Sequence, residues 1–317
     1  MPRRLAYRLI QAALVLLALS FVVYALMGLM PGDPVQLMAA GSPTMTPADV
    51  ARLKALYGVD RPLMERYLHW LAAALSGDLG YSRLSGTTVL RALLPPLGNS
   101  CALMLTSLAT ALLAALPLGV VAALKSGGWL DRGLNLAAFA AVSLPVFWLG
   151  LVLVMLFAVG LAWLPASGVA TVGEGGLFDR LRHLVLPAGA LALAGFGLYF
   201  RYMRAAMIAA LGQDWVRTAR AKGLSWPQVA LRHVLRNALV PVVTVVALDL
   251  GTLFSGVLVT ETVFAYPGMG KLIYDAVMGS DYNLALAALM LATALTLVGS
   301  ILADLAYAVL DPRVRFR

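Results

Sequence analysis

The chain alternates between long apolar stretches and shorter polar segments. A helix that crosses a bilayer needs about 20 mostly apolar residues. About six stretches meet this requirement: Leu9–Met30, Asn99–Leu124, Leu134–Leu161, Leu184–Phe200, Leu239–Val259 and Leu284–Val309. The pattern therefore predicts an all-α, multi-pass membrane protein with about six transmembrane helices.

Glycine and proline modify these predicted spans. The fourth contains Gly189, Gly195 and Gly197, which permit close contact between helices. Pro117 and Pro145 lie inside the second and third, where neighbouring helices can satisfy the carbonyl groups that a proline frees. The first stretch is longer than the 7–15-residue apolar core of a signal peptide, so we expect it to remain as a span.

The composition supports burial in a membrane. Hydrophobic residues make up 61% of the chain and charged residues 12%, whereas soluble domains carry roughly 25% charged residues. Too few charges are present to cover a globule, which excludes a cytosolic enzyme. The single cysteine, Cys101, excludes both a disulfide framework and a cysteine-rich metal site.

The basic residues predict the orientation. Segments 1–8, 125–132, 201–236 and 311–317 carry most of the Lys and Arg and few acids. Because such segments face the cytoplasm, we expect both termini there, in a protein of the cell's inner membrane. The net charge of +9 then reflects topology, and it does not indicate a nucleic-acid partner.

Residues 31–97 form the one sizeable predicted segment on the outer side. Pro31–Pro34 predicts a turn, and Thr46, Pro47 and Asp49 predict the start of a helix that Thr46 caps. A second helix follows Pro62, and its apolar face includes Leu63, Tyr67, Trp70, Leu71 and Ala74. This face either packs on the membrane helices or receives another protein.

The polar segment 201–236 lies between the fourth and fifth spans. Asp214–Leu224 predicts a short helix closed by Gly223, and Ser225 with Gln228 predicts a capping box that starts a second helix, which runs to about Asn237. We expect Trp215 and Ala219 on one side of the short helix, and Arg217 and Arg220 on another. Such a helix suits either a groove on a cytoplasmic partner or the anionic headgroups of membrane lipids.

The stretch Arg217–Pro241, with Thr218–Leu224 and His233–Leu239, resembles the coupling-loop signature of ATP-binding-cassette importer permeases, and specifically the B-type permease subunit of the peptide/nickel family. Gly223 takes the signature glycine, while the glutamate and proline of the general signature are replaced. Three further stretches are similar to the family: Pro31–Pro34, Glu261–Gly270 and Leu310–Arg313.

The resemblance implies a type I importer permease fold and a role without covalent chemistry. The partners it implies are a second homologous permease, two cytoplasmic ATPase subunits, an external substrate-binding protein and membrane lipid. The implied substrates are peptides first, with nickel or metallophore complexes and glutathione as alternatives. The residues implied to dock on the ATPase are Asp214, Trp215, Arg217, Thr218, Ala219, Arg220, Ala221, Lys222, Gly223 and Leu224.

The chain then divides into four parts. They are a cytoplasmic N-terminus and first span (1–30), an extracytoplasmic helical segment (31–97), a five-helix core (98–310) that contains the coupling loop 201–236, and a cytoplasmic tail (311–317).

No catalytic, metal or cofactor site is predicted. Gly270-Lys271 lacks the hydroxyl residue and the first glycine of a phosphate-binding loop, and His69, His183 and His233 lack the spacing of metal ligands. Asp249 lies in mid-span, where it either lines the passage or forms a hydrogen bond to a neighbouring helix. A rival interpretation is an ion-gradient-driven transporter with Asp249 as its ion site, although the sequence shows no internal repeat of the kind common in such folds.

Overall fold

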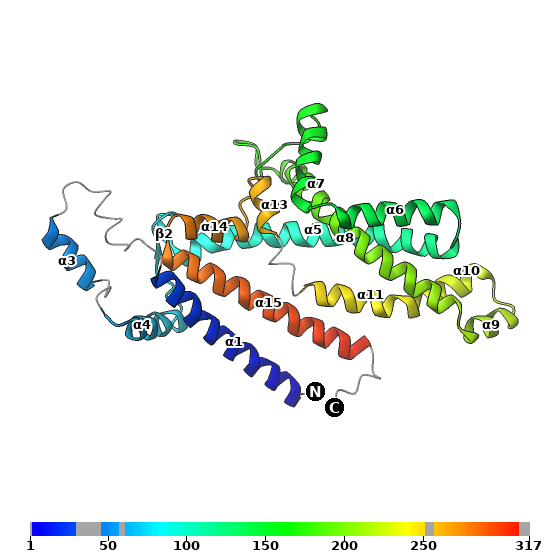
Figure 1. Ribbon diagram of the computed structural model, residues 1–317, viewed down its shortest axis with the longest axis horizontal. Coiled ribbons are helices and arrows are strands. Elements are labelled where there is room, and N and C mark those ends of the chain that lie inside the picture. The colour runs from blue at the N-terminus through cyan, green and yellow to red at the C-terminus, as the bar shows by residue number, and fades with distance from the viewer. Residues whose placement is uncertain (1, 30–45, 57–60, 251–256, 311–317) are drawn as a thin grey trace. The chain divides into compact units, whose positions relative to one another are not determined.

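The computed structural model describes residues 2–29, 46–56, 61–250 and 257–310 (Figure 1). The described chain is almost entirely helical and forms two compact units. Unit 1 comprises Met1–Gly98 and Gly268–Leu295, and unit 2 comprises Asn99–Pro267 and Thr296–Arg317. The predicted turn at Pro31–Pro34, part of the fifth span and the tail 311–317 lie outside the described residues.

Within the described residues, five helices are long and apolar enough to cross a membrane. The bent pair Trp129–Ser143 and Val146–Gly160 adds a sixth crossing if it counts as one span. The helices that carry these crossings are α1 (Pro2–Gly28), α5 (Val89–Leu124), α6 (Trp129–Ser143), α7 (Val146–Leu153) with the π-helix η1 (Val154–Gly160), α8 (Leu177–Leu211), α11 (Leu235–Leu250) and α15 (Tyr282–Leu310). The predicted all-α membrane architecture is confirmed.

The third predicted span is not one continuous helix, which corrects the expectation for Leu134–Leu161. Helices α6 and α7 meet at an angle of 104°. Pro145 disfavours helical backbone at the residue before it, and Leu144 is extended, with φ −91° and ψ 133°. The proline therefore breaks this span rather than kinking it.

The fourth predicted span is longer than expected. Helix α8 continues through residues 201–211, which are mostly apolar, and ends at Leu211. The first part of the predicted loop 201–236 is therefore helical and prolongs the span. Pro187 lies within α8 and does not interrupt it.

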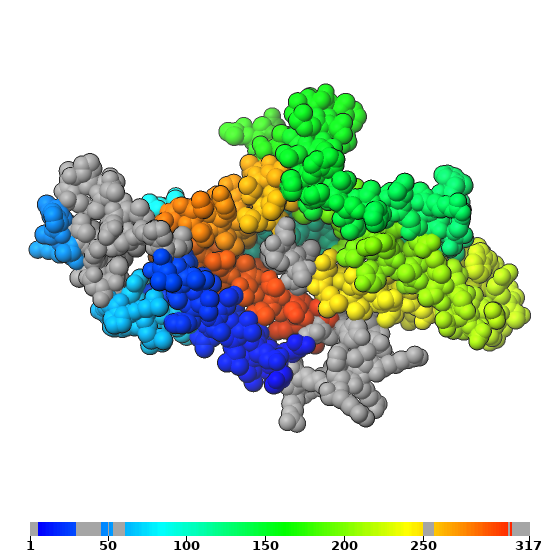
Figure 2. All heavy atoms as spheres, in the orientation of Figure 1, coloured from blue at the N-terminus to red at the C-terminus, as the bar shows by residue number. Residues whose placement is uncertain are grey.

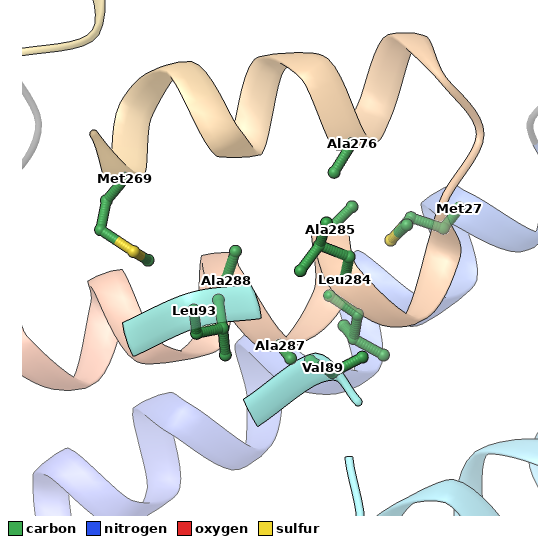
Figure 3. Packing of buried hydrophobic residues seen from close by; sticks show 10 residues of the cluster. Met27, Val89, Leu93, Met269, Ala276, Leu284, Ala285, Ala287 and Ala288 are labelled. Carbon is green, nitrogen blue, oxygen red and sulfur yellow. The ribbon is translucent and has the colours of Figure 1, made fainter. Parts of the chain in front are cut away.

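Unit 1 builds its core from four helices. Met269 and Ala276 of α14 (Met269–Met278) face Leu284 and Ala285 of α15, beside the start of α5 and Met27 of α1 (Figure 3). A two-stranded antiparallel hairpin, β1 (Tyr81–Ser82) and β2 (Thr87–Thr88), precedes α5. The hairpin is tied to α15 because Asp281 accepts hydrogen bonds from the Ser82 hydroxyl at 2.7 Å and the Leu84 amide at 3.0 Å.

The two helices predicted in 31–97 are present as α3 (Pro47–Leu56) and α4 (Leu63–Leu75). The Thr46 hydroxyl and Asp49 carboxylate are 2.7 Å apart, and their hydrogen bonds hold the pKa of Asp49 below its ordinary value. Tyr67 of α4 packs edge-on against Phe21 and Tyr24 of α1. Its hydroxyl lies 2.8 Å from that of Ser20, so the apolar face of α4 packs on a membrane helix.

Unit 2 is organised around α8, which packs along α6, α7 and α11 (Figure 1). A Cβ atom added at Gly197 would lie 2.3 Å from the carbonyl oxygen of Ala138 in α6. One added at Gly119 would lie 2.8 Å from Cβ of Met203, where α5 meets α8. Glycine at these crossings lets the helix backbones approach closely, as predicted for Gly197.

Candidate functional site

The predicted short helix after α8 is present as α9 (Asp214–Ala221). The backbone amide of Gly223 donates to the carbonyl of Arg220 at 2.9 Å, and that of Leu224 donates to the carbonyl of Ala219 at 3.4 Å. Gly223 has a φ of +83°. These two bonds around a left-handed glycine form a Schellman motif, which ends α9 where the sequence predicts.

The capping box that starts the next helix is also present. The Ser225 amide donates to Oε1 of Gln228 at 3.1 Å, at the start of α10 (Trp226–Gln228). The π-helix η2 (Val229–Val234) follows and leads directly into α11. The helix therefore continues past the predicted end near Asn237 and becomes the fifth membrane helix.

The buried side of α9 fixes it to α8. Val216 and Ala219 are buried in a cluster with Met203 and Met207 of α8 and Val229 and Val234 of η2. The buried face is centred on Val216 and Ala219, which are 3% and 8% exposed, whereas Trp215, expected on the same side as Ala219, is 37% exposed. The i, i+3 spacing of Val216 and Ala219 is the sequence signal that identifies the buried face.

The other side of α9 is exposed and basic. All the predicted docking residues except Ala219 are exposed, namely Asp214, Trp215, Arg217, Thr218, Arg220, Ala221, Lys222, Gly223 and Leu224. The Arg220 guanidinium carbon lies 5.4 Å from the centroid of the Trp226 ring, a cation–π contact between α9 and α10. The loop forms an uncovered end of unit 2 (Figure 2). We call these exposed residues the α9 surface.

An ion pair on α8, which sequence reasoning missed, lies close to this site. Arg204 is located two turns before the end of α8 and binds Asp131 of α6, with Nε 2.6 Å from Oδ1 and Nη2 2.7 Å from Oδ2. The partners lie 73 positions apart in the chain, so no local pattern could reveal the pair.

Asp249, expected in mid-span, is the last residue but one of α11, and residues 251–256 of the predicted span lie outside the described residues. Asp249 is half-buried. It accepts a hydrogen bond from the hydroxyl of Tyr199, a buried residue of α8. The hydrogen bond to a neighbouring helix, one of the two roles expected for Asp249, is therefore formed.

A hollow of about 310 Å³ lies between α5, α7 with η1, and α8. Its walls are almost wholly apolar, with Phe157, Leu186 and Phe196 among the lining residues. Thr110 is the one polar residue among those that line it, so the walls offer few hydrogen bonds to a peptide backbone. Among the described residues, no group of three or more His, Cys, Asp or Glu side chains is placed to hold a metal ion.

Comparison with known proteins gives matches over the whole chain. The family model "Binding-protein-dependent transport system inner membrane component" matches residues 115–316, and the model of its N-terminal part matches residues 1–119. The chain is 38% identical to the oligopeptide transport system permease protein AppB of Bacillus subtilis, over 95% of this chain and 96% of that protein. It is 36% identical to the di/tripeptide transport system permease protein DppB of Pseudomonas aeruginosa, over 93% and 94%. It is 34% identical to the dipeptide transport system permease protein DppB of Escherichia coli, over 95% of each.

Proposed function

The chain belongs to the family of binding-protein-dependent transport system inner membrane components, and from this we propose that it forms half of the path by which an ATP-driven importer moves peptides. The printed names of its relatives, which are dipeptide, di/tripeptide and oligopeptide permeases, support peptides over the nickel and glutathione alternatives. Membership in a binding-protein-dependent family also disfavours the ion-driven rival.

The observation that carries the coupling role is the construction of α9. A helix passes the movement of a partner into the fold when one side is packed firmly on that fold and the other side is accessible to the partner. Val216 and Ala219 attach α9 to α8 and η2, while the α9 surface is free for a partner. We assign the α9 surface to docking in a groove of a cytoplasmic ATPase subunit, with Arg217 and Arg220 facing it.

The motion that follows docking passes into the membrane helices directly. Helix α8 ends one short turn before α9, and η2 leads into α11 without a break. Displacement of α9 therefore moves α8 and α11 together, because all three share one buried cluster. When the ATPase subunits bind ATP and close on each other, this movement would change the side of the membrane to which the path is open. Such a change is a shift between two conformational states.

The remaining partners are assigned from the same proposal. A second, homologous permease completes the path, two ATPase subunits bind the cytoplasmic face, and a substrate-binding protein delivers the peptide from outside. The basic α9 surface is cytoplasmic, as the positive-inside rule requires, and both termini lie on that side. Chemistry on the substrate is not required of this chain.

Asp249 is assigned to the path in this proposal. Its carboxylate is half-buried, is held by Tyr199 and lies among membrane helices, where an ionised group is costly unless it faces water or a partner. The positively charged amino terminus of a peptide is a suitable transient partner for it.

The test is to purify the tagged chain gently from its own membranes and to identify the proteins that come with it. We expect two ATPase chains and a second permease. The complex, reconstituted in proteoliposomes with its binding protein, should accumulate a labelled dipeptide or oligopeptide only when ATP is present. Accumulation driven by an ion gradient without ATP would contradict the proposal.

A further inference from the structure

The carboxylate of Asp131 is the centre of a small network at the start of α6. Besides the two bonds from Arg204, it accepts the backbone amide of Gly127 at 2.9 Å and the side-chain amide of Asn135 at 2.7 Å. The Asp131 side chain is 4% exposed and that of Arg204 is 26% exposed. The pair is therefore held in one geometry by the turn between α5 and α6, by α6 itself and by α8.

The register of the pair matches that of the close contact between α6 and α8 at Gly197. Gly197 of α8 meets Ala138 of α6, and Arg204 meets Asp131. Along α8 the two contacts are separated by about two turns, and along α6 by the same interval in the opposite direction. Helices α6 and α8 are thus antiparallel and joined at two points, one apolar and tight, the other ionic.

The ionic contact lies on the part of α8 that carries α9. Met203 and Met207, which flank Arg204 in the chain, are fully buried in the cluster that holds Val216 and Ala219. Met203 and Met207 therefore hold these turns of α8 against α9, and Arg204 holds them against α6. A displacement of α9 reaches Arg204 before it reaches the crossing at Gly197.

We propose that the Asp131–Arg204 ion pair is the contact through which movement of α9 is passed to α6, and that both are positioning residues for transport. This inference rests on the proposed function. A bidentate ion pair fixes direction and register, whereas an apolar contact at the same place could slide. Without the pair, α8 would still move with α9 but could shift along α6, so ATP would be hydrolysed with less peptide imported.

The readout is the amount of peptide imported per ATP hydrolysed by the reconstituted complex. For Arg204→Gln and Asp131→Asn we expect this ratio to fall at least five-fold, while the ATPase subunits still co-purify and hydrolyse ATP. Arg201→Gln is the matched control, because Arg201 lies one turn earlier on α8 and donates to the Gly197 carbonyl instead. The amount of peptide that Arg201→Gln imports per ATP hydrolysed should stay within two-fold of the value for the unchanged protein.

The double variant Asp131→Asn with Arg204→Gln should keep a ratio within two-fold of either single variant, because both substitutions remove the same contact, whereas two independent losses of packing would multiply. An unchanged ratio in the single variants, or losses that multiply in the double variant, overturns the inference. If Arg204→Gln does not assemble, Arg204→Met takes its place, because methionine keeps much of the side-chain length without the charge, and an unchanged ratio there is equally contradictory. Failure of the unchanged protein to bind ATPase subunits would instead overturn the proposed function.

Discussion

The hydroxyl of Tyr199 on α8 donates a hydrogen bond to the carboxylate of Asp249, the one acidic residue of α11 (Leu235–Leu250), and so joins two membrane helices. Two variants separate a structural role from a role in the path. Tyr199→Phe removes the hydrogen bond and leaves the charge, whereas Asp249→Asn keeps an acceptor oxygen and removes the charge.

If Asp249 meets the amino terminus of the substrate, Asp249→Asn should lower peptide uptake by roughly ten-fold, as expected for the loss of one charge-assisted hydrogen bond. Tyr199→Phe should have a smaller effect. Uptake assays on proteoliposomes compare the two. Equal effects of both variants, or unchanged uptake in Asp249→Asn, would restrict Asp249 to packing.

The crossing of α6 and α8 predicts a loss of stability in Gly197→Ala. The added methyl group would lie 2.3 Å from the Ala138 carbonyl oxygen, so the helices must separate, at a cost of about 1–3 kcal/mol. Gly133→Ala in α6 is the control, because no atom lies within 4 Å of its added Cβ and alanine favours a helix by about 1 kcal/mol. Thermal unfolding of the purified chain should move in opposite directions for the two variants.

The end of α9 depends on the conformation of Gly223. Nothing lies within 4 Å of an added Cβ, so a substitution acts through the backbone, whose φ is +83°. Gly223→Val should strain the Schellman motif by about 1–3 kcal/mol and strongly reduce uptake, with the protein still inserted in the membrane. Gly223→Asn, which tolerates this conformation, should retain most uptake. Equal uptake in the two variants would mean that the shape of the turn is unimportant.

The attachment of α9 to α8 is tested at Val216. Val216→Asp places a carboxylate in the buried cluster at a cost of several kcal/mol, which should release α9 and abolish ATP-driven uptake. Val216→Ala removes two methyl groups and should cause only a partial loss. ATP hydrolysis measured alongside uptake shows whether the defect lies in coupling. Full uptake in Val216→Asp would be incompatible with a rigid attachment.

The local features of the site were predictable because hydrogen bonds between near neighbours specify them. Gly223 ends α9, and Ser225 with Gln228 starts the next helix, as their spacing indicates. The apolar stretches likewise predicted the membrane helices, with boundaries altered where tertiary packing extends a helix, as in α8.

Features that depend on distant parts of the chain were not predictable in the same way. The Asp131–Arg204 pair requires α6 and α8 to be antiparallel in one register. Helix α14 begins directly after Pro267-Gly268, and its packing on Leu284 and Ala285 holds it in place. Helix α7, which follows the break at Pro145, packs on α8, and no local spacing reveals this contact.

The central claim is that the α9 surface contacts an ATPase subunit, and photo-crosslinking tests it most directly. A photoreactive amino acid is placed at Thr218, which is exposed on α9, or at Val172, which is fully exposed in the loop before α8 and expected on the outer side. In the assembled, transport-competent complex, we predict a crosslink from position 218 to an ATPase subunit and none from position 172. A complex that imports peptide with ATP yet gives no crosslink from position 218 would contradict the account.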